Sequence, residues 1–487
     1  MSSLSHFENA VFRYRSIDAL LGEFEELERQ TVYFSKPEKL NDPMEGLRQV
    51  YWRGDRTTWR NLLRHYVICL HNRLIEALLT EDDGRLAPQA ITVFQSLENF
   101  ATPQARSLCK ACIDAVESGD LHAALLDLLA NADRDIGLSE LQQLLRTVHT
   151  YWLNTVHRIL SDQGLAPRGG SIDHDPKGIA AILNNLQDLM PQVREQLSDS
   201  GIEIIHEVQR SMGEQTTLLA AFQHSAVLKP KHESLIFEFT PEYLAGIMKL
   251  VYPPWNVSCF SVRHDNAAMW SYYAGDHKGC CLVFRKHQTD TGFKLRLNGP
   301  NGYGSRGVSR GTQDFPLDAV RYTVDQQRVE FFTNIGRLPL DATLRDWFRD
   351  DSGHTSPLAG HLIDDRQEEW RKAYWQGFVP PLLRKLPDWR HEEEFRIVLS
   401  DILGIHDTDE GRTFTYDYDT LDGIIFGINT TLSDRVRIMA IVHKKLAART
   451  IPEPFKFYQA HFNSKSGRIE AHHLSLIDCT ISDSLDR

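Results

Sequence analysis

The feature of this sequence that most restricts its fold is a long helical stretch between two segments of mixed helix and strand pattern. From Thr57 to Leu228 apolar residues recur at spacings of three and four, which is the period of amphipathic helices. The segments on either side alternate short β-prone runs with helical ones, so we expect an α+β core that is discontinuous in sequence. The expected parts are residues 1–56, the N-terminal part of the core, residues 57–228, a helical insertion, and residues 229–487, the remainder of the core with helical excursions and a C-terminal tail.

The first fifty residues predict a strand, a helix and a second strand. Val11–Arg15 alternates at period two, and Thr31–Phe34 is a second β-prone run. Between them Ser16 is placed to cap a helix over Ile17–Leu27. These elements would supply the first strands of the core.

The C-terminal half predicts further strands alternating with helices. The expected strands are Leu235–Phe239, Val257–Val262, Gly279–Phe284, Ala319–Tyr322, Phe395–Leu399, Gly423–Phe426 and Ile438–Val442. The expected helices are Pro241–Leu250, Asp325–Asn334 and Arg366–Leu386. This mixture would complete the α+β core.

The charge balance bears on possible partners. The chain has 54 Lys and Arg against 66 Asp and Glu, a net charge of −12, which argues against a surface that is positive all over. Arg285–Arg310 nevertheless contains six basic residues and one acid, so a local basic surface is available for a polyanion. Within it Gly302–Gly307 reads G-x-G-x-x-G, but no amphipathic helix follows and no βαβ unit surrounds it. We therefore interpret Gly299–Gly311 as a flexible loop.

Cysteine usage and hydropathy bear on the compartment. Seven cysteines in 487 residues are too few for a disulfide scaffold and favour a reducing environment. Cys109 and Cys112 form a lone C-x-x-C inside a helical pattern, where they are expected to be buried apolar residues rather than a redox or metal pair. No signal segment and no stretch near the ~18 apolar residues of a membrane span is seen. We expect a soluble cytoplasmic protein.

Side chains suited to ligand binding occur near the N-terminus. Arg13 and Arg15 are two apart on the expected first strand, so both guanidinium groups lie on one side and could grip a phosphate or carboxylate. The alternative is an exposed strand face balanced by nearby acids. Ser35 and Asn41 lie in a polar loop made rigid by Asn-Asp-Pro, because the residue before proline is conformationally restricted.

An aromatic segment forms a second candidate. Trp270, Tyr272, Tyr273 and His277 lie within eight residues ahead of an expected strand. Aromatic faces that carry polar groups suit stacking on a flat ring such as nicotinamide or a base. The alternative is a set of structural residues.

A third candidate is the charged start of the strand near Phe395. Read as a strand, Glu392, Glu394 and Arg396 share one face. A carboxylate beside an arginine at a cleft can polarise a sugar hydroxyl or stabilise a developing cation. The alternatives are a charged edge strand and a helix with an i,i+4 pair between Glu392 and Arg396.

Taken in order, these segments resemble a bacterial family known as domain of unknown function 2971. The segments that carry the resemblance are Phe12–Ser16, Phe34–Pro43, Trp270–Cys281, Glu392–Arg396 and Ile424–Gly427. The sequence departs from the family pattern at Tyr272, where the family usually has His. The resemblance covers about half of the chain and leaves the helical stretch outside it.

The order of strand arginine, aromatic segment and strand glutamate is also similar to ADP-ribosyltransferases, especially the toxins that modify DNA bases. This fold-level resemblance implies an ADP-ribosyltransferase-like mixed sheet core that takes NAD as substrate without a metal. It implies that Arg13 or Arg15 holds the pyrophosphate or nicotinamide ribose, and that Tyr273 with Trp270 stacks on nicotinamide. Glu394 would stabilise an oxocarbenium-like transition state. The implied catalytic residues are Glu394, Tyr273 and Arg15, and the implied NAD-binding residues are Arg13, Ser35, Asn41, Trp270, His277 and Glu392.

The resemblances lead us to expect an enzyme that splits NAD and transfers ADP-ribose to a nucleic-acid or protein acceptor, as a toxin or antiphage effector. The helical insertion would recognise a target or recruit a partner protein. One alternative is a non-catalytic module that binds a nucleotide or nucleic acid. Another is a metal-dependent nuclease that uses Asp42, Glu392 and Glu394.

Overall fold

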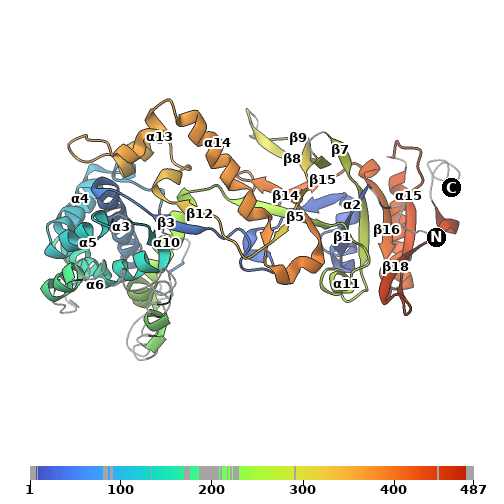
Figure 1. Cartoon of the computed structure of the whole chain (residues 1–487), viewed down its shortest axis with the longest axis horizontal. Helices are drawn as coiled ribbons and strands as arrows, with labels where there is room; N and C mark the ends of the chain where they lie inside the picture. Colours follow the sequence, from blue (N-terminus) through green and yellow to red (C-terminus); the bar gives the residue numbers. More distant parts are fainter. Residues whose placement is uncertain are drawn as a thin grey trace. The chain divides into compact units, whose positions relative to one another are not determined.

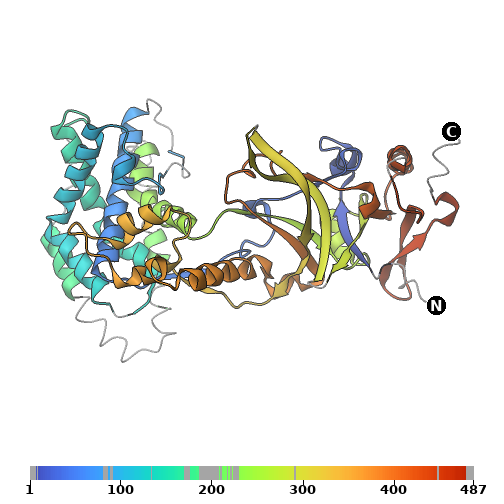
Figure 2. The same ribbon diagram turned by 90° about the horizontal axis from the view of Figure 1, so that it is seen from above.

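The computed structural model describes residues 7, 9–80, 86–87, 91–132, 134–168, 176–185, 204, 208, 211–215, 218–219, 222, 230–289, 292–305, 307–446 and 449–478. The chain combines helices and strands, as an α+β fold requires, and forms two compact units (Figures 1 and 2). The first unit consists of Met1–Leu47, Pro254–Gln326 and Gly377–Arg487. The second consists of Arg48–Pro253 and Gln327–Gln376.

An eight-stranded sheet forms the centre of the first unit. Its strands in spatial order are β10 (Asp318–Ala319), β14 (Glu394–Ser400), β5 (Trp255–Ser261), β1 (Ala10–Arg15), β6 (Cys280–Arg285), β16 (Leu421–Phe426), β17 (Lys456–Asn463) and β18 (Arg468–His473). All neighbours pair antiparallel except β16 and β17, which are parallel. The N-terminal strand therefore lies in the middle of the sheet, between strands from the C-terminal half.

A second sheet packs against one face of the first. Its strands in order are β2 (Thr31–Tyr33), β15 (Thr413–Thr415), β8 (Gly292–Gly304) and β7 (His287–Thr289), with β9 (Gly307–Pro316) also paired to β8. Leu295 and Phe414 of this sheet share one apolar core with Phe260, Phe284 and Ile397 of the eight-stranded sheet. Burial of these side chains drives the two sheets together.

Short elements complete the first unit. Its helices are α1 (Ile17–Leu21), α2 (Glu26–Arg29), α11 (Ala267–Tyr273) and α15 (Leu432–Lys445), and β11 (Arg321–Tyr322) pairs with β13 (Arg384–Lys385). Its 3-10 turns are Pro37–Lys39, Pro380–Leu383, Pro387–Glu392, Tyr418–Thr420 and Ser475–Ile477. Helix α11 covers the other face of the eight-stranded sheet, where Trp270 packs in a second core with Phe12 and Tyr14.

The second unit is mainly helical. Its helices are α3 (Arg56–Leu79), α4 (Pro103–Glu117), α5 (Asp120–Ala130), α6 (Leu138–Asp162), α9 (Pro230–Glu233), α10 (Phe239–Ile247), α12 (Leu340–Thr343), α13 (Gly360–Ile363) and α14 (Gln367–Phe378), the last ending in the first unit. Its π-turns are Ser234–Glu238 and Leu344–Phe348, and its 3-10 turns are Leu97–Asn99, Met248–Leu250, Phe332–Asn334 and Pro357–Ala359. A small sheet has the order β12 (Arg328–Glu330), β3 (Gln49–Trp52) and β4 (Ile136–Gly137).

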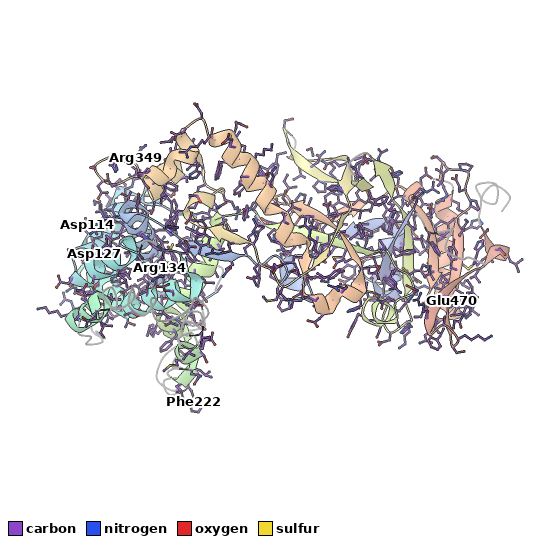
Figure 3. The ribbon with its side chains drawn as sticks, viewed as in Figure 1. Asp114, Asp127, Arg134, Phe222, Arg349 and Glu470 are labelled. Atoms are coloured by element: carbon purple, nitrogen blue, oxygen red, sulfur yellow. The ribbon has the colours of Figure 1, made fainter. Side chains whose placement is uncertain are left out.

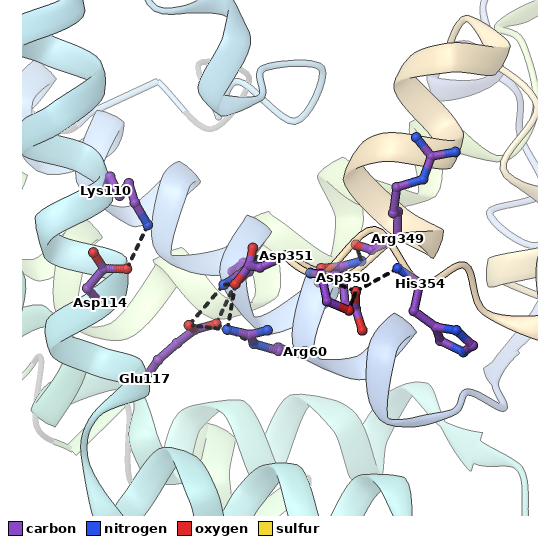
Figure 4. A network of polar contacts seen from close by, with 11 residues as sticks. Arg60, Lys110, Asp114, Glu117, Arg349, Asp350, Asp351 and His354 are labelled. Carbon is purple, nitrogen blue, oxygen red and sulfur yellow. Dashed lines mark hydrogen bonds and ion pairs between the residues drawn. The ribbon is translucent and has the colours of Figure 1, made fainter.

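Ion pairs connect the loop around Asp351 to the helices of the second unit (Figure 4). Arg60 of α3 contacts Glu117 of α4 at 2.9 Å and Asp351 at 3.0 Å. Arg64, one turn further along α3, contacts the same two carboxylates at 2.5 and 2.6 Å. The loop at Asp351 therefore packs on the α3–α4 pair, although more than 280 residues separate it from Arg60 in the sequence.

Several expected elements form as predicted. Val11–Arg15 lies within β1, and the Ser16 side chain caps α1 by accepting a hydrogen bond from the Ala19 amide. Cys109 and Cys112 are buried in α4 and free of disulfides, as expected for apolar core residues. Local patterns of apolar spacing and capping were sufficient at these positions.

Two segments expected to be strands are helical, so those predictions were wrong. Leu235–Phe239 lies in a π-turn that runs into α10. Ile438–Val442 lies in α15, where Ile438 and Val442 are four apart and both buried on one face. Short apolar runs do not distinguish a strand from one buried helix face. The side chain of Thr431 caps α15 through the Asp434 amide and signals the helix instead.

Two other segments contain strands that the sequence does not predict. Gly299–Gly311 is not a flexible loop, because it belongs to the antiparallel ribbon of β8 and β9. Asp325–Asn334 is not a helix, because it contains β12, which pairs with β3. Glycine is unfavourable inside strands, so the glycines of this segment predict a loop. Gly299 is nevertheless required in β8, because the Phe414 ring occupies the space that a Cβ atom would need.

The units divide the chain differently from the expected boundaries. The helical unit begins at Arg48 and continues to Pro253, and the expected boundary at Leu228 lies outside the described residues. It also contains Gln327–Gln376, which the sequence assigned to the core. The β12–β3 pairing explains the addition, because it joins this segment to the start of the helical unit.

We predict that Gly299→Ala destabilises the first unit. Its Cβ atom would come within 2.0 Å of the Phe414 ring, and such overpacking costs about 1–3 kcal/mol in the free energy of unfolding. Gly304→Ala is the matched control, because its Cβ atom would approach only the Gly307 carbonyl oxygen, at 3.9 Å. Thermal and urea unfolding followed by circular dichroism measure both variants, and equal stability of the two would contradict this packing.

Candidate functional site

A pocket opens where β5 changes its partner on one edge. The ladder between β1 and β5 contains the single pair Phe12 and Ser261, whereas β14 pairs with β5 along its whole length. Further along the same edge, Val257 of β5 exchanges backbone hydrogen bonds with Ser35, at 2.8 and 2.9 Å. Side chains from both strands therefore line the space between these two pairings.

The pocket has a volume of about 160 Å³ and brings together seven of the nine residues expected at the site. These are Arg13, Arg15, Ser35, Asn41, Tyr273, Glu392 and Glu394. They come from β1, the loop after β2, α11, the turn before β14, and β14 itself. Segments far apart in sequence thus meet at one place in the first unit.

Two arginines of β1 form the basic side of the pocket. Arg13 is buried, donates to the Ser258 hydroxyl, and reaches the Tyr33 carbonyl oxygen at 3.2 Å. Arg15 is partly exposed and is paired through two nitrogens with the buried Glu26 carboxylate. Burial and the neighbouring Arg15 lower the pKa of Arg13 to about 10. Two guanidinium groups face the single carboxylate of Glu26, so basic groups outnumber acidic ones on this side.

A buried cluster of five ionisable groups forms the opposite side. Lys385 Nζ lies 2.5 Å from Glu392, 3.0 Å from Glu394 and 3.4 Å from Glu45. Arg396 contacts Glu394 at 2.7 Å and Glu45 at 2.5 Å. All five side chains are at most 4% exposed. Three carboxylates face two cations, so the fully ionised cluster carries one net negative charge.

Burial and ion pairing act in opposite directions on these carboxylates. Burial alone would raise the pKa of Glu394, but Arg396 and Lys385 outweigh it and hold that pKa well below its usual range. Burial raises the pKa of Glu45 despite the same two cations. Glu394 therefore stays ionised at neutral pH, because its two cationic partners replace the water it has lost.

Tyr273 connects this cluster to the polar loop. Its hydroxyl donates to Glu392 Oε1 at 2.7 Å and accepts a hydrogen bond from Asn41 Nδ2, also at 2.7 Å. Burial and the nearby Glu392 raise the pKa of Tyr273, so it remains a neutral donor. Asn41, Tyr273 and Glu392 thus form one hydrogen-bonded chain along the pocket wall.

Two expected site residues lie outside the pocket lining. Trp270 is fully buried, donates from Nε1 to the His264 carbonyl at 2.8 Å and packs edge-on against Tyr14. His277 holds the turn after α11, where its amide donates to the Trp270 carbonyl and its own carbonyl accepts from Asn429. Both residues position the segment that carries Tyr273.

Sequence reasoning missed Lys385 and Glu45, which complete the buried cluster. Glu45 follows the rigid Asn-Asp-Pro turn, and an acidic residue beside a rigid polar turn could have indicated a place at the site. Lys385 lies in the short strand β13 within a segment expected to be helical, and no local pattern marks it. Its role depends on carboxylates from other segments.

The geometry also bears on the alternative of a metal-dependent nuclease that uses Asp42, Glu392 and Glu394. Asp42 uses both carboxylate oxygens to accept backbone hydrogen bonds, from Met44 and Leu386, each at 2.9 Å. The Lys385 ammonium group lies among Glu392, Glu394 and Glu45, where a cation would otherwise bind. The ammonium group of Lys385 therefore takes the position of a metal ion among these carboxylates, and the site does not support a metal-dependent nuclease.

Comparison with known proteins adds one finding. Residues 269–397 match a family model described as Protein of unknown function (DUF2971), which supports the resemblance drawn from the sequence motifs. The matched segment contains Tyr273, Lys385, Glu392 and Glu394. Neither the curated proteins nor the solved structures contain a match to this chain. No helix among the described residues combines the length and the apolar composition needed to cross a membrane.

We predict that Lys385→Met makes the protein more sensitive to acid. A carboxylate with a lowered folded pKa stabilises the fold above its unfolded pKa of about 4.3, and this contribution is lost as the pH falls through the folded value. Removing Lys385 raises the folded pKa of Glu394, so the loss begins at higher pH. The acid-unfolding midpoint, followed by tryptophan fluorescence, should rise by about one pH unit.

At neutral pH the same variant should lose about 3–5 kcal/mol in the free energy of unfolding, because it removes the cation that pairs with the buried Glu392 and leaves Glu394 and Glu45 to share Arg396. Lys465→Met, at an exposed position, is the control and should match the wild type. An unchanged midpoint and stability in Lys385→Met would contradict a dependence of the site on this cation.

Proposed function

We propose that this protein is an ADP-ribosyltransferase-like enzyme that cleaves NAD and transfers ADP-ribose to a macromolecule. The observation that carries the proposal is the charge asymmetry of the pocket. Arg13 and Arg15 make one side basic, and the buried cluster around Glu394 has three carboxylates against two cations, so the other side is acidic when all five groups are ionised. NAD has the complementary arrangement, because its pyrophosphate is anionic and its nicotinamide ring is cationic.

The pocket size supports an orientation for NAD. A volume of about 160 Å³ is smaller than the roughly 300–1,000 Å³ of sites that enclose a whole ligand. It suits the nicotinamide and its ribose, which would lie beside Tyr273 and the acidic cluster. The pyrophosphate would lie at Arg13 and Arg15, with the adenosine outside. Ser35 and Asn41 would position the ribose from the loop side.

In the proposed reaction the bond between C1′ of the ribose and N1 of nicotinamide breaks, and its electron pair leaves with nicotinamide. The ionised Glu394 carboxylate would stabilise the positive charge that develops on the ribose. An acceptor nucleophile then bonds to C1′ and releases its proton to solvent. Arg396 and Lys385 would fix the orientation of Glu394 before the substrate binds.

The remaining expected residues have indirect roles in this proposal. Glu392 would hold the Tyr273 ring in place through the 2.7 Å hydrogen bond. Trp270 and His277 would support the α11 segment from below the pocket rather than contact NAD. Transfer of ADP-ribose to an essential macromolecule would make the protein a toxin or an antiphage effector, with the helical unit as its target-recognition or partner-binding part.

One observation favours a second candidate, a non-catalytic module that binds a nucleotide. Both carboxylate oxygens of Glu394 accept hydrogen bonds from Arg396, at 2.7 and 3.1 Å. A carboxylate held in this way also serves as a structural bridge between segments. In that case NAD or a related nucleotide would bind without being cleaved.

We predict that the full chain releases nicotinamide from labelled NAD, with label transferred to DNA, RNA or protein supplied in the assay. Glu394→Gln should lower this rate at least about 100-fold, since it removes the charge that stabilises the transition state. Glu393→Gln is the matched control. Its side chain is 44% exposed and pairs with Arg263, so it should retain wild-type activity. Absence of nicotinamide release by the wild type, with NAD binding retained, would select the non-catalytic module.

We predict a smaller effect for Tyr273→Phe, which removes the hydrogen bonds to Glu392 and Asn41. Loss of these contacts should reduce kcat/KM about tenfold, which corresponds to about 1.4 kcal/mol. Tyr272→Phe is the control, because the Tyr272 side chain is 69% exposed and does not line the pocket. Equal effects in the two variants would argue against a role for Tyr273 in the reaction.

A further inference from the structure

A second pocket lies within the helical second unit, and its lining residues differ from those of the first pocket. Its volume of about 370 Å³ is more than twice that of the first pocket. This volume falls within the roughly 300–1,000 Å³ of sites that enclose a small ligand. The walls come from α3, α4 and the segments 93–99 and 338–351. Nothing described so far gives this pocket a function.

Hydrogen bonds within the protein fix the walls of this pocket. The buried His65 of α3 donates from Nε2 to the Val93 carbonyl oxygen at 2.9 Å and accepts at Nδ1 from the Tyr243 hydroxyl at 3.0 Å. Asn61, one turn earlier on α3, is also buried and donates from Nδ2 to the Arg349 carbonyl oxygen at 3.0 Å. The pocket is therefore preformed, as is usual for small-molecule sites.

The interior of the pocket is apolar. The buried side chains that line it are Ile68, Val93, Ile113 and Trp347, each at most 6% exposed. Phe94 adds a ring that is 45% exposed, and the Arg337 guanidinium lies 4.9 Å from the centre of this ring. Transfer of an apolar group from water into this interior is favourable.

Charged side chains complete the lining in equal numbers. The basic residues are Arg64, Lys110, Arg345 and Arg349, and the acidic residues are Glu98, Asp346, Asp350 and Asp351. The ion pairs of these acids are Glu98 with Arg106 at 3.3 Å, Asp346 with Arg345 at 2.8 Å and Asp351 with Arg64 at 2.6 Å. Asp350 accepts hydrogen bonds from the Ser352 and His354 amides, both at 2.9 Å. Each carboxylate of the lining thus has a partner within the protein.

Arg349 is the cation of this lining that has no carboxylate partner among the described residues. The other three basic residues are in ion pairs. The Arg349 side chain, labelled in Figure 3, reaches the Thr355 hydroxyl at 3.5 Å, beyond the usual length of a hydrogen bond. Figure 4 shows its guanidinium apart from the network of Arg60, Glu117 and Asp351. Its donors are therefore available to a ligand, and a guanidinium matches a planar carboxylate through two parallel hydrogen bonds.

We propose that this pocket binds a small monocarboxylate with an apolar body, either a medium-chain fatty acid or an arylalkanoic acid. The carboxylate pairs with Arg349, and the apolar body lies against Ile68, Val93 and Ile113. One cation left over from otherwise paired charges suits a single negative charge. A phosphate monoester carries about 1.5–2 negative charges at pH 7 and would meet four carboxylates with one available cation, so it is disfavoured.

The test is isothermal titration calorimetry of the full chain with octanoate and, separately, with 3-phenylpropionate. At least one acid should bind with a dissociation constant below about 1 mM and raise the Tm as its concentration rises. The acid that binds more tightly shows whether the body is a straight chain or an aromatic ring. The alcohol and the phosphate monoester of the same body should bind at least about tenfold more weakly than the acid.

Two variants locate the binding site. Arg349→Met should weaken binding of the acid at least about tenfold. Arg371→Met is its matched control, because Arg371 is 51% exposed on α14, pairs with Glu368 at 2.7 Å and does not line the pocket. Ala342→Phe should block binding by filling the pocket, whereas Leu340→Phe on the same helix, outside the lining, should not.

The proposal is overturned if neither acid binds, or if the phosphate monoester binds more tightly than the acid. Equal affinities of Arg349→Met and Arg371→Met would also contradict it, as would unchanged binding by Ala342→Phe. Circular dichroism and thermal melting of each variant without ligand separate a loss of binding from a loss of fold.

Discussion

Two buried cations, Lys385 and Arg396, hold together the segments from which the pocket is built. They form ion pairs with Glu45 from the N-terminal segment, Glu392 from the turn before β14 and Glu394 from β14 itself. A buried cluster of this kind is costly unless every charge is paired, and removal of one member leaves an uncompensated charge. The position of each pocket side chain therefore depends on the complete set.

The incomplete pairing of β5 in the sheet leaves the pocket through which a ligand can reach this cluster. Because β5 pairs with β1 only at Ser261 and with Ser35 at Val257, side chains between these positions line a pocket instead of a closed ladder. The same arrangement places the arginines of β1 across from the carboxylates. The charge asymmetry on which the proposed function rests is thus a consequence of strand pairing.

Features encoded locally were predictable from the sequence, and those that depend on distant pairing were not. The strand with Arg13 and Arg15, the cap at Ser16 and the strand with Glu394 and Arg396 could be predicted from short patterns. Glu392, expected on that same strand, lies instead in the 3-10 turn before it. Lys385 was missed because only carboxylates from other segments give it a role. The local sequence around Gly299 predicts a loop rather than the ribbon, because the Phe414 ring that requires this glycine lies over a hundred residues away.

The most direct test of the account is a crystal structure of the full chain with a non-cleavable NAD analogue. The account predicts the nicotinamide ring beside Tyr273, its ribose at Glu394, and the pyrophosphate at Arg13 and Arg15. An analogue bound in the reverse orientation, with its phosphates at the acidic cluster, would contradict the charge argument. So would an analogue bound elsewhere on the protein with this pocket empty.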